Sequence, residues 1–573
     1  MPNVPRQQPV TVVSWKRVWL LTAVTAILAP FVYRDFGVTF DEGAQAEYGD
    51  LALQYYRTAG ADDRVNNFYN LRYYGPAVEM AASLVAGGGS NRRFEARHLL
   101  LALIATLSIP AIAAFAGHAG RRGVPLIAAT ILLTMPRFTG HAFNNSKDVP
   151  FALAFILFMA TLAAVLIDSN YSWRRILAAG AAFGFALSIR PGGLLLLGVF
   201  FICISRIIEV VPAMRGRERP LESAEATTRS HRKLAILGIA WLSMFLLWPY
   251  AHARPLLSLA ESTALALSLP RPIPVLFEGQ IVSSAAIPWY YLPKMLIITT
   301  PLTVLAMAAL GATTGLRSVF RKDGDARFGV VALLTTMWLV VPIALFIVRR
   351  PAVYDGIRHF LFLLPALAIL AALGATTFGA AIANRFGRPV AGAIVAVLVL
   401  LPVKDVVRLH PYQMTYYNGL VGGVAGAAPA YDTDYWLSGY REAMTWIGEE
   451  TADEPERTVN VLMAGFPIPS PEDLADGPEC WTDRRPPAEQ VLVTDFLKTV
   501  ATHAAARNVR VHTLPELWET GRDAAEMDFY VATTRWGYDR CLPDAPIVHS
   551  VGRAGATFVV VKATLPDASL GIP

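Results

Sequence analysis

Long stretches without a charged side chain recur from the N-terminal region to position 403 of this 573-residue chain. A helix that crosses a bilayer needs about 20 predominantly apolar residues, because its backbone polar groups find no water there and must bond to each other. Only 16% of the residues are charged, whereas soluble globular proteins have about 25%. We therefore predict an α-helical polytopic membrane protein with about eleven transmembrane helices. The predicted spans are Val18–Val32, Leu99–Phe115, Val124–Met135, Val149–Ile167, Ile176–Ile189, Leu194–Val211, Leu234–Leu247, Leu292–Leu310, Val330–Val348, Phe360–Thr376 and Val390–Val403.

Basic residues predict the orientation of these helices, because cytoplasmic loops are enriched in Lys and Arg. The N-terminus and every second loop after it are basic. These positions are Arg6, Lys16, Arg17, Arg121, Arg122, Arg174, Arg175, Arg215, Arg217, Arg219, Arg229, Arg232, Lys233, Arg317, Arg321, Lys322, Arg327, Arg385 and Arg388. The N-terminus is thus predicted inside, and an odd number of spans places the C-terminal region outside. The net charge of +6 is explained by this pattern, so no nucleic-acid partner is predicted.

The hydropathy falls after position 403, and short alternating or β-branched runs replace the long apolar segments. RTVNVLMAGFP, VRVHTL, MDFYVATT and TFVVVKA read as strands, and LVTDFLKTVATHAAARN reads as a helix. We predict a transmembrane domain over 1–403 with large outer loops at 34–97 and 248–291, and an exported α/β domain over 404–573. Cys480 and Cys541 both lie in that domain, and whether they are bonded is left open.

Two acidic clusters are predicted to lie on the same, outer face. Asp41 and Glu42 follow the first span, and His141, Lys147 and Asp148 precede the fourth. Two acidic sites next to apolar helices suit a general base and a partner that positions the substrate. Alternatives remain for both clusters. Asp41 and Glu42 can be a hydrated helix end, and Lys147 and Asp148 can be an ion pair at a helix start.

Basic residues also occur on this predicted outer face, against the usual bias. Arg271, Lys294, Arg358 and His359 are candidates to bind a phosphate group, since Arg and Lys offer charge-assisted hydrogen bonds to its oxygens. Contact with anionic lipid headgroups is the alternative.

Aromatic residues beside these loops are candidates for sugar or acceptor binding. Tyr290 and Tyr354, with Asp355 and His141, complete this candidate set. The alternative for the aromatics is the interfacial belt common to membrane proteins. No Cys/His metal-ligand spacing, P-loop or dinucleotide fingerprint is present. No metal ligand is therefore assigned.

Five motifs in their order along the chain carry a resemblance to a known family. They are FDE at 40–42, NSKDVPFAL, YDGIRHFLFLLP, HPYQMTYYNGLVGG and YDTDYWLSGYREAMTWI. Together they resemble membrane glycosyltransferases of the GT-C class, most of all the dolichyl-phosphate-mannose protein mannosyltransferase superfamily, which includes the bacterial lipid A aminoarabinose transferases. The resemblance covers about Phe40 to Trp446.

The resemblance implies transfer of a sugar from a polyprenyl-phosphate donor to an acceptor hydroxyl on the non-cytoplasmic face of a bacterial inner membrane. It implies that Asp41 is the base or acceptor anchor, with Glu42 beside it, and that Asp148 is the second acidic residue. Arg358, Lys294 and Arg271, in that order, with His359 and Lys147, are expected near the donor phosphate. One base and one cationic clamp suit an inverting single displacement.

The chain departs from the family in two places. Lys147 precedes Asp148 where the eukaryotic mannosyltransferases have an acidic pair, and the C-terminal domain does not resemble their β-trefoil. The acceptor is therefore left as a glycan, a lipid or a protein. The sugar, the oligomeric state and a requirement for a divalent cation are also left open.

Two other classes of function remain. A lipid-linked substrate transporter or flippase would place ionisable residues near the middle of its spans, whereas the charged residues here cluster at the predicted ends. A non-catalytic membrane scaffold would bind a partner through its exported domain and would not need the outer acidic and basic clusters.

Overall fold

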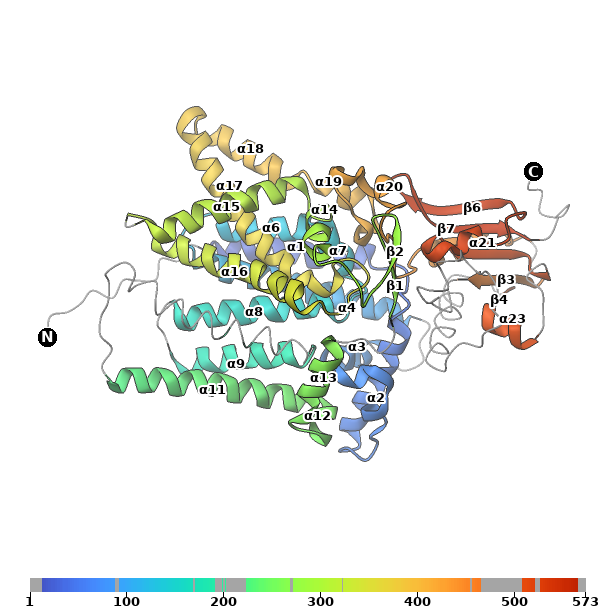
Figure 1. The fold of residues 1–573 in the computed structure, drawn as a ribbon, viewed down its shortest axis with the longest axis horizontal. Helices are drawn as coiled ribbons and strands as arrows, with labels where there is room; N and C mark the ends of the chain where they lie inside the picture. Colours follow the sequence, from blue (N-terminus) through green and yellow to red (C-terminus); the bar gives the residue numbers. More distant parts are fainter. Residues whose placement is uncertain are drawn as a thin grey trace.

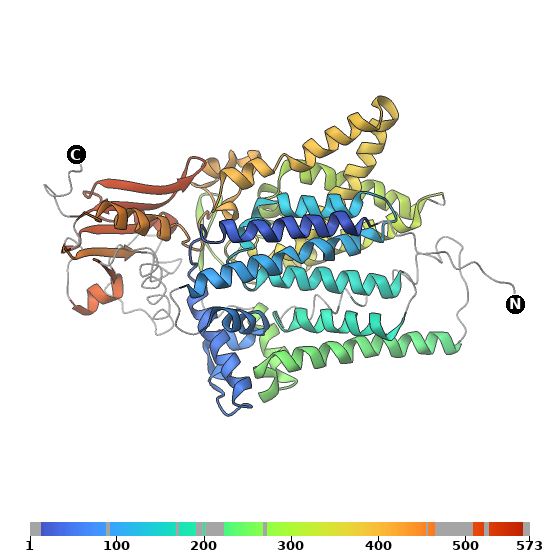
Figure 2. The ribbon, with the colours of Figure 1, turned by 180° about the vertical axis from the view of Figure 1, so that it is seen from behind.

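The structure is a computed structural model that describes residues 13–87, 92–167, 171–190, 198, 201, 223–267, 272–321, 323–453, 456–464, 508–520 and 526–564. A bundle of long helices carries a β-sheet domain at one end (Figure 1). The view from behind shows the same arrangement, with the C-terminal sheet beyond the ends of the helices (Figure 2).

Eight helical segments of the described residues are long and apolar enough to cross a membrane. The chain is accordingly a multi-pass membrane protein. The segments contain α1 (Trp15–Val32), α4 and α5 (Arg93–Thr106 and Ser108–Gly117), α8 (Asp148–Leu166), most of α11 (Ser223–Leu247), α15 (Leu302–Phe320), α16 (Ala326–Arg349), η4 and α17 (Arg358–Leu363 and Leu364–Phe386), and α18 and α19 (Arg388–Leu400 and Val403–Arg408).

Three of the predicted spans have no counterpart of that length among the described residues. Helices α6 (Val124–Thr134) and α9 (Trp173–Leu187) have 11 and 15 residues. The predicted span Leu194–Val211 lies outside the described residues apart from two positions. A fourth, Leu292–Leu310, is divided into α14 (Tyr291–Ile298) and α15, with Pro301 between them. The expected number of eleven, and the side of the membrane that follows from it, stay predictions.

Close packing of α15 on α17 shows why the bundle needs small residues. A Cβ atom on Gly311 would lie 1.9 Å from the Leu370 carbonyl oxygen, and one on Gly374 would lie 1.9 Å from that of Met307. Such separations are impossible, so both positions require glycine. Small residues that let two helix backbones approach are typical of membrane helix interfaces.

The first predicted outer loop folds largely as helices. These are α2 (Glu42–Arg57), η1 (Arg64–Asn67), η2 (Tyr69–Tyr73) and α3 (Ala77–Ala86). The other predicted outer loops contribute α7 (Pro136–His141), α12 (Pro249–Ala253), α13 (Leu257–Leu267) and an antiparallel hairpin of β1 (Pro274–Phe277) and β2 (Gln280–Ser283). These elements lie at the end of the bundle that carries the C-terminal domain (Figure 1).

The C-terminal domain is built on a five-stranded sheet in the order β4-β3-β5-β7-β6. Strand β3 pairs parallel with β4 and β5, whereas β7 pairs antiparallel with β5 and β6. The elements are α21 (Tyr440–Glu450), β3 (Val459–Ala464), β4 (Val509–Thr513), α23 (Leu514–Thr520), β5 (Phe529–Thr533), η9 (Arg535–Arg540), β6 (Ile547–Arg553) and β7 (Ala556–Ala563).

All four predicted strands are confirmed, and the predicted helix at 492–508 lies outside the described residues apart from its last position. Cys541 is disulfide-bonded, and Cys480 lies outside the described residues.

The sheet domain and the bundle share a hydrophobic cluster. Val38 and Phe94 of the membrane part pack in one cluster with Ile447, Phe529 and Phe558. Polar contacts reinforce this packing: an Arg441 guanidinium nitrogen donates to the Phe36 carbonyl at 2.8 Å. The C-terminal domain is therefore held directly against the end of the bundle where the predicted outer loops meet.

Candidate functional site

Asp41 and Arg358, predicted from loops more than 300 residues apart in sequence, are in contact. Asp41 lies directly before α2, and Arg358 begins η4. A guanidinium nitrogen of Arg358 donates to a carboxylate oxygen of Asp41 at 3.0 Å. The Asp41 side chain is 26% exposed and that of Arg358 is 7% exposed. The pair thus joins a carboxylate that solvent reaches to a nearly buried cation.

Two further groups extend this pair into the protein. Arg358 Nε lies 3.0 Å from Oδ2 of Asp355, and Arg535 of the C-terminal domain donates to Oδ1 of Asp355 at 2.7 Å. Asp355 has a φ of 59°, a left-handed conformation that is uncommon for a residue other than glycine. Its two arginine partners hold its carboxylate in place in that conformation. We call Asp41, Arg358, Asp355 and Arg535 the open cluster.

Asp432 is a third carboxylate next to Arg535, at 3.4 Å from its Nε. Burial is the main cause that raises the pKa of Asp432 to about 6; Arg535 opposes this rise, and Asp355 contributes to it. This carboxylate therefore takes up a proton more readily than an exposed aspartate does.

Asp148 lies near the open cluster in a separate pair. Its side chain is 3% exposed, and it forms an ion pair with Arg190. Asn145 Nδ2 donates to its other oxygen at 3.0 Å, while Asn145 Oδ1 accepts the backbone N–H of Asp148 at 2.7 Å. The Asp148 carboxylate is thus enclosed by partners.

Lys147 is not paired with its neighbour Asp148, contrary to one of the sequence alternatives. Its ammonium lies 4.8 Å from the centre of the Tyr74 ring, and among the described residues it has no ion-pair or hydrogen-bond partner. Burial lowers the pKa of Lys147, while Asp41 and Glu79 oppose that shift. Its charge, which lies over the Tyr74 ring, is available to an anion.

His141 is a buried connecting residue. Its Nε2 lies 2.7 Å from the Tyr435 hydroxyl, and its Nδ1 lies 3.3 Å from Asn145 Nδ2. Burial lowers the pKa of His141 well below its ordinary value, and Arg137 and Arg358 lower it further. Because Asn145 Nδ2 is a donor, Nδ1 of the neutral ring accepts and the ring proton lies on Nε2.

Glu42, adjacent to Asp41, occupies a different environment. Its Oε2 accepts from the Thr39 amide at 2.7 Å, and its Oε1 lies 2.9 Å from His98 Nε2. Nearby, Arg97 donates to Glu79 at 2.5 Å, and Ser146 Oγ lies 2.5 Å from the other Glu79 oxygen. All of these side chains are buried. We call Glu42, His98, Glu79, Arg97 and Ser146 the closed cluster.

The remaining predicted residues lie in two places. Tyr354 packs under the Arg358 guanidinium at 4.8 Å and contacts the His359 ring edge-on at 4.9 Å. Lys294 and Tyr290 both bind Glu278, which follows strand β1. Arg271 lies outside the described residues.

Among the residues that the structure describes, no group of three or more His, Cys, Asp or Glu side chains is placed to hold a metal ion. Asp41 and Asp148 each face an arginine.

Sequence reasoning missed Arg535, Arg190, Arg137 and Tyr435. Arg137 is buried, donates to the Tyr416 carbonyl at 3.0 Å, and has two guanidinium nitrogens without a hydrogen-bond partner. Arg137 and Arg190 could have been found by the same signal as Arg358, a basic residue in a predicted outer loop. Arg535 carries no comparable signal, because arginines are common in a soluble domain.

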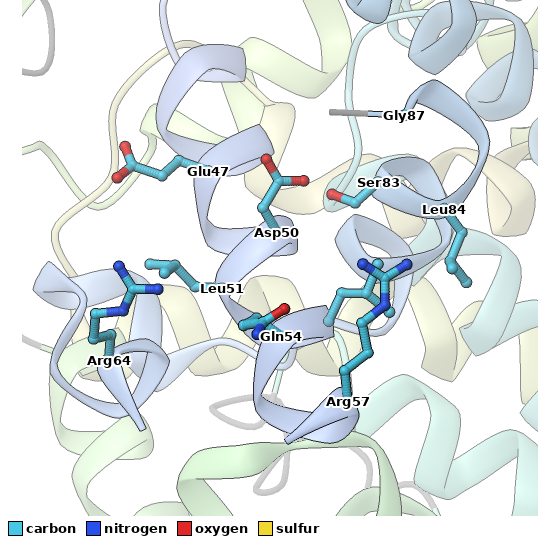
Figure 3. A pocket seen from close by; sticks show the side chains of 10 residues that line it. Glu47, Asp50, Leu51, Gln54, Arg57, Arg64, Ser83, Leu84 and Gly87 are labelled. Carbon is cyan, nitrogen blue, oxygen red and sulfur yellow. The ribbon is translucent and has the colours of Figure 1, made fainter. Parts of the chain in front are cut away.

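A cavity of about 370 Å³ lies elsewhere, over α2 and α3. Glu47, Asp50, Leu51, Gln54, Arg57, Arg64, Ser83, Leu84 and Gly87 line it, with Leu53 (Figure 3). None of the open-cluster residues belongs to this lining, so the cavity is separate from Asp41.

No family model and no curated protein matches the sequence. The chain is similar to several solved structures. ArnT from Cupriavidus metallidurans bound to undecaprenyl phosphate is 14% identical, with a TM-score of 0.43 over 98% of this chain and 100% of that one. The oligosaccharyltransferase of Archaeoglobus fulgidus in the apo form is 11% identical, with a TM-score of 0.46 over 90% of this chain and 69% of that one.

The arabinofuranosyltransferase AftD from Mycobacteria is 13% identical, with a TM-score of 0.41 over 97% of this chain and 40% of that one. Each TM-score is below 0.5. The function is therefore argued below from the residues of this chain.

Proposed function

We propose that this protein is a membrane glycosyltransferase that moves a sugar from a polyprenyl-phosphate donor to an acceptor hydroxyl. The observation that carries the proposal is the Asp41–Arg358 pair, in which a carboxylate with 26% exposure lies against a nearly buried guanidinium. Glu42, Asp148 and Asp355 have side chains no more than 3% exposed. Asp41 is thus the carboxylate among these candidates that an acceptor can reach.

The reaction requires a base for the acceptor and cations for the leaving group. Asp41 takes the proton of the acceptor hydroxyl, whose oxygen forms a bond to the anomeric carbon. The bond from that carbon to the phosphate oxygen breaks, and polyprenyl phosphate leaves with the electron pair. Arg358 and Lys147 stabilise the developing phosphate charge. Attack opposite the leaving group inverts the anomeric configuration.

The positions of the other residues assign them supporting roles. Asp148 and Arg190 border this site as an enclosed pair, which suits a role in orienting the sugar or acceptor. Tyr354, Asp355 and His141 hold Arg358 and its surroundings. Glu42 belongs to the closed cluster, so we assign it support of the α2 start and no contact with the substrate.

The proposed location is a bacterial cytoplasmic membrane, with the site and the C-terminal domain on the non-cytoplasmic side. The basic turn between α17 and α18 lies at the end of the bundle opposite the C-terminal domain (Figure 1). That arrangement agrees with the excess of Lys and Arg in cytoplasmic loops. Membrane lipid and the lipid-linked donor are the proposed partners, with a glycan, lipid or protein as acceptor.

The test is transfer of labelled sugar from a panel of polyprenyl-phosphate sugars by the purified protein, with and without added divalent cation. Asp41→Asn should lower turnover by about 10²- to 10⁴-fold, the range typical of a general base, while binding of polyprenyl phosphate persists. The matched control is Glu47→Gln, an exposed carboxylate on the same helix, which should retain turnover.

Two outcomes would contradict the proposal. Unchanged turnover in Asp41→Asn would remove Asp41 from the role of base. Absence of both transfer and donor hydrolysis in folded wild-type protein, over the whole panel and a range of acceptors, would favour a transporter or a scaffold.

A further inference from the structure

Arg535 connects the C-terminal domain to both acidic sites of the membrane part. It lies two residues after β5, at the start of η9, and its backbone N–H donates to Thr533 Oγ1 at 3.1 Å. Its side chain is 6% exposed. A buried arginine at the end of a strand, aimed at another domain, is too far from solvent to be a surface charge.

The first connection runs to the base. Arg535 donates to Asp355 at 2.7 Å, Asp355 pairs with Arg358 at 3.0 Å, and Arg358 donates to Asp41 at 3.0 Å. Positive and negative side chains alternate along this series of contacts. Arg358 lies between the carboxylates of Asp355 and Asp41, and Asp355 lies between the two arginines.

The second connection runs to Asp148. Arg535 donates to the Tyr435 carbonyl at 2.5 Å, and the Tyr435 hydroxyl lies 2.7 Å from His141. His141 accepts from Asn145 at 3.3 Å, and Asn145 donates to Asp148 at 3.0 Å. A single residue of the C-terminal domain thus reaches both acidic sites through hydrogen bonds and ion pairs.

This arrangement changes the charge that Arg358 presents. If Asp355 had Arg358 as its main partner, its negative charge would cancel much of the positive charge that a donor phosphate needs. Because Arg535 shares the Asp355 carboxylate, Arg358 keeps more of its charge for an anion. Arg535 binds Oδ1 of Asp355 and so fixes the carboxylate whose Oδ2 orients the Arg358 guanidinium.

From these contacts we propose that Arg535 is a positioning residue, through which the C-terminal domain sets the orientation and the charge of Arg358 for the donor phosphate. The inference rests on the proposed function, since it assigns Arg358 to the phosphate. It gives the C-terminal domain a part in donor binding beyond its packing against the bundle.

The experiment is a double-mutant cycle on donor kinetics with Arg535→Gln, Asp355→Asn and the combined variant. Arg535→Gln should raise the donor KM about tenfold and leave the acceptor KM unchanged. In the Asp355→Asn background the same change should raise the donor KM less than threefold, because the route to Arg358 is already broken. Arg535→Lys should recover part of the loss.

Arg540→Gln is the matched control, since Arg540 is exposed in the same short helix η9. It should behave as wild type, and thermal unfolding in detergent should show that all variants are folded. An unchanged donor KM in Arg535→Gln would overturn the inference. An equal loss in both backgrounds would also overturn it, because that result describes damage to the domain contact.

Binding of a sugar-free polyprenyl phosphate separates the two proposals. If wild type neither transfers sugar nor binds this lipid, both proposals fail. If wild type transfers sugar and the cycle is additive, the inference about Arg535 alone fails. If wild type binds the lipid without transfer and Arg535→Gln weakens the binding, the positioning role is supported and the proposed reaction is not.

Discussion

The open and closed clusters begin at consecutive residues, yet their surroundings are opposite. Asp41 and Glu42 are one position apart at the start of α2, and successive helical positions point about 100° apart. Asp41 consequently meets solvent and Arg358, whereas Glu42 turns inward to Thr39 and His98. Both clusters contain carboxylates and arginines, so residue type does not separate them. Solvent access to Asp41 does, and it divides this acid, which is suited to chemistry, from Glu42, which holds the helices together.

The two clusters also differ in how many partners their carboxylates have. In the open cluster, Asp355 has two arginine partners and Asp41 can be hydrated. In the closed cluster, the ion-pair partner of Glu79 is Arg97. Loss of one partner should therefore affect function in the open cluster and stability in the closed cluster. The Arg97 and Arg358 variants below test that contrast.

Arg97→Met is expected to have the largest effect. It leaves the Glu79 carboxylate buried with the Ser146 hydroxyl as its partner, and breaking a buried ion pair in this way destabilises proteins by about 3–5 kcal/mol. Thermal unfolding in detergent measures the loss.

Arg93→Met is the control for Arg97→Met. Arg93 lies on the same helix, α4, and pairs with Asp50, whose side chain is 40% exposed. The released Asp50 carboxylate can be hydrated, so the loss should be smaller. If Arg97→Met unfolds at the wild-type temperature, the closed cluster does not have the structural role that we assign to it.

Arg358→Gln should have the second-largest effect, and that effect should be on turnover. Loss of a single group that stabilises transition-state charge typically lowers the rate by about 10²- to 10³-fold. Stability should change little, because Asp355 retains Arg535 and Asp41 is partly exposed. Arg358→Lys keeps a charge without the planar fork and should fall between Gln and wild type.

Labelled-sugar transfer per folded molecule, measured beside thermal unfolding, checks the prediction for Arg358. The contrast between the clusters would be wrong if Arg358→Gln lowered the unfolding temperature as much as Arg97→Met does, while sugar transfer per folded molecule stayed at the wild-type rate. That result would make both clusters structural.

Part of this comparison was predictable from the sequence. That Asp41 and Arg358 lie at the same end of the bundle followed from the alternation of apolar segments alone, and the strands of the C-terminal sheet needed only their local pattern. The inward direction of Glu42 had no comparable sequence signal, since the buried positions of α2, among them Gln45, Ala46 and Gly49, do not form an apolar stripe.

The partnership of Arg535 with Asp355 could not be predicted. These residues are 180 positions apart, and they meet only because the C-terminal sheet packs on the bundle end through apolar residues such as Val38 and Phe529. Arg190 with Asp148 is a similar case, because the contact depends on how the two loops come together. Local pattern identifies which residues carry charge, and tertiary packing decides which of them are partners.

Lys294→Ala should have the smallest effect. The Lys294 side chain is 34% exposed and forms an ion pair with Glu278. The hydrogen bond that Lys294 donates to Glu278 is the main cause that raises the pKa of Lys294, so its charge is already matched. Exposed ion pairs contribute about 0–1 kcal/mol, and removal of this one should change the donor KM less than about threefold. Glu278→Gln is the matched variant and should change the donor KM as little as Lys294→Ala does.

A loss of donor binding in Lys294→Ala as large as that of Arg358→Gln would extend the phosphate site to the β1–β2 hairpin. In that case, partial exposure of a charged side chain, at Lys294 as at Asp41, would mark the groups that meet the substrate. The open cluster would then have to include Lys294.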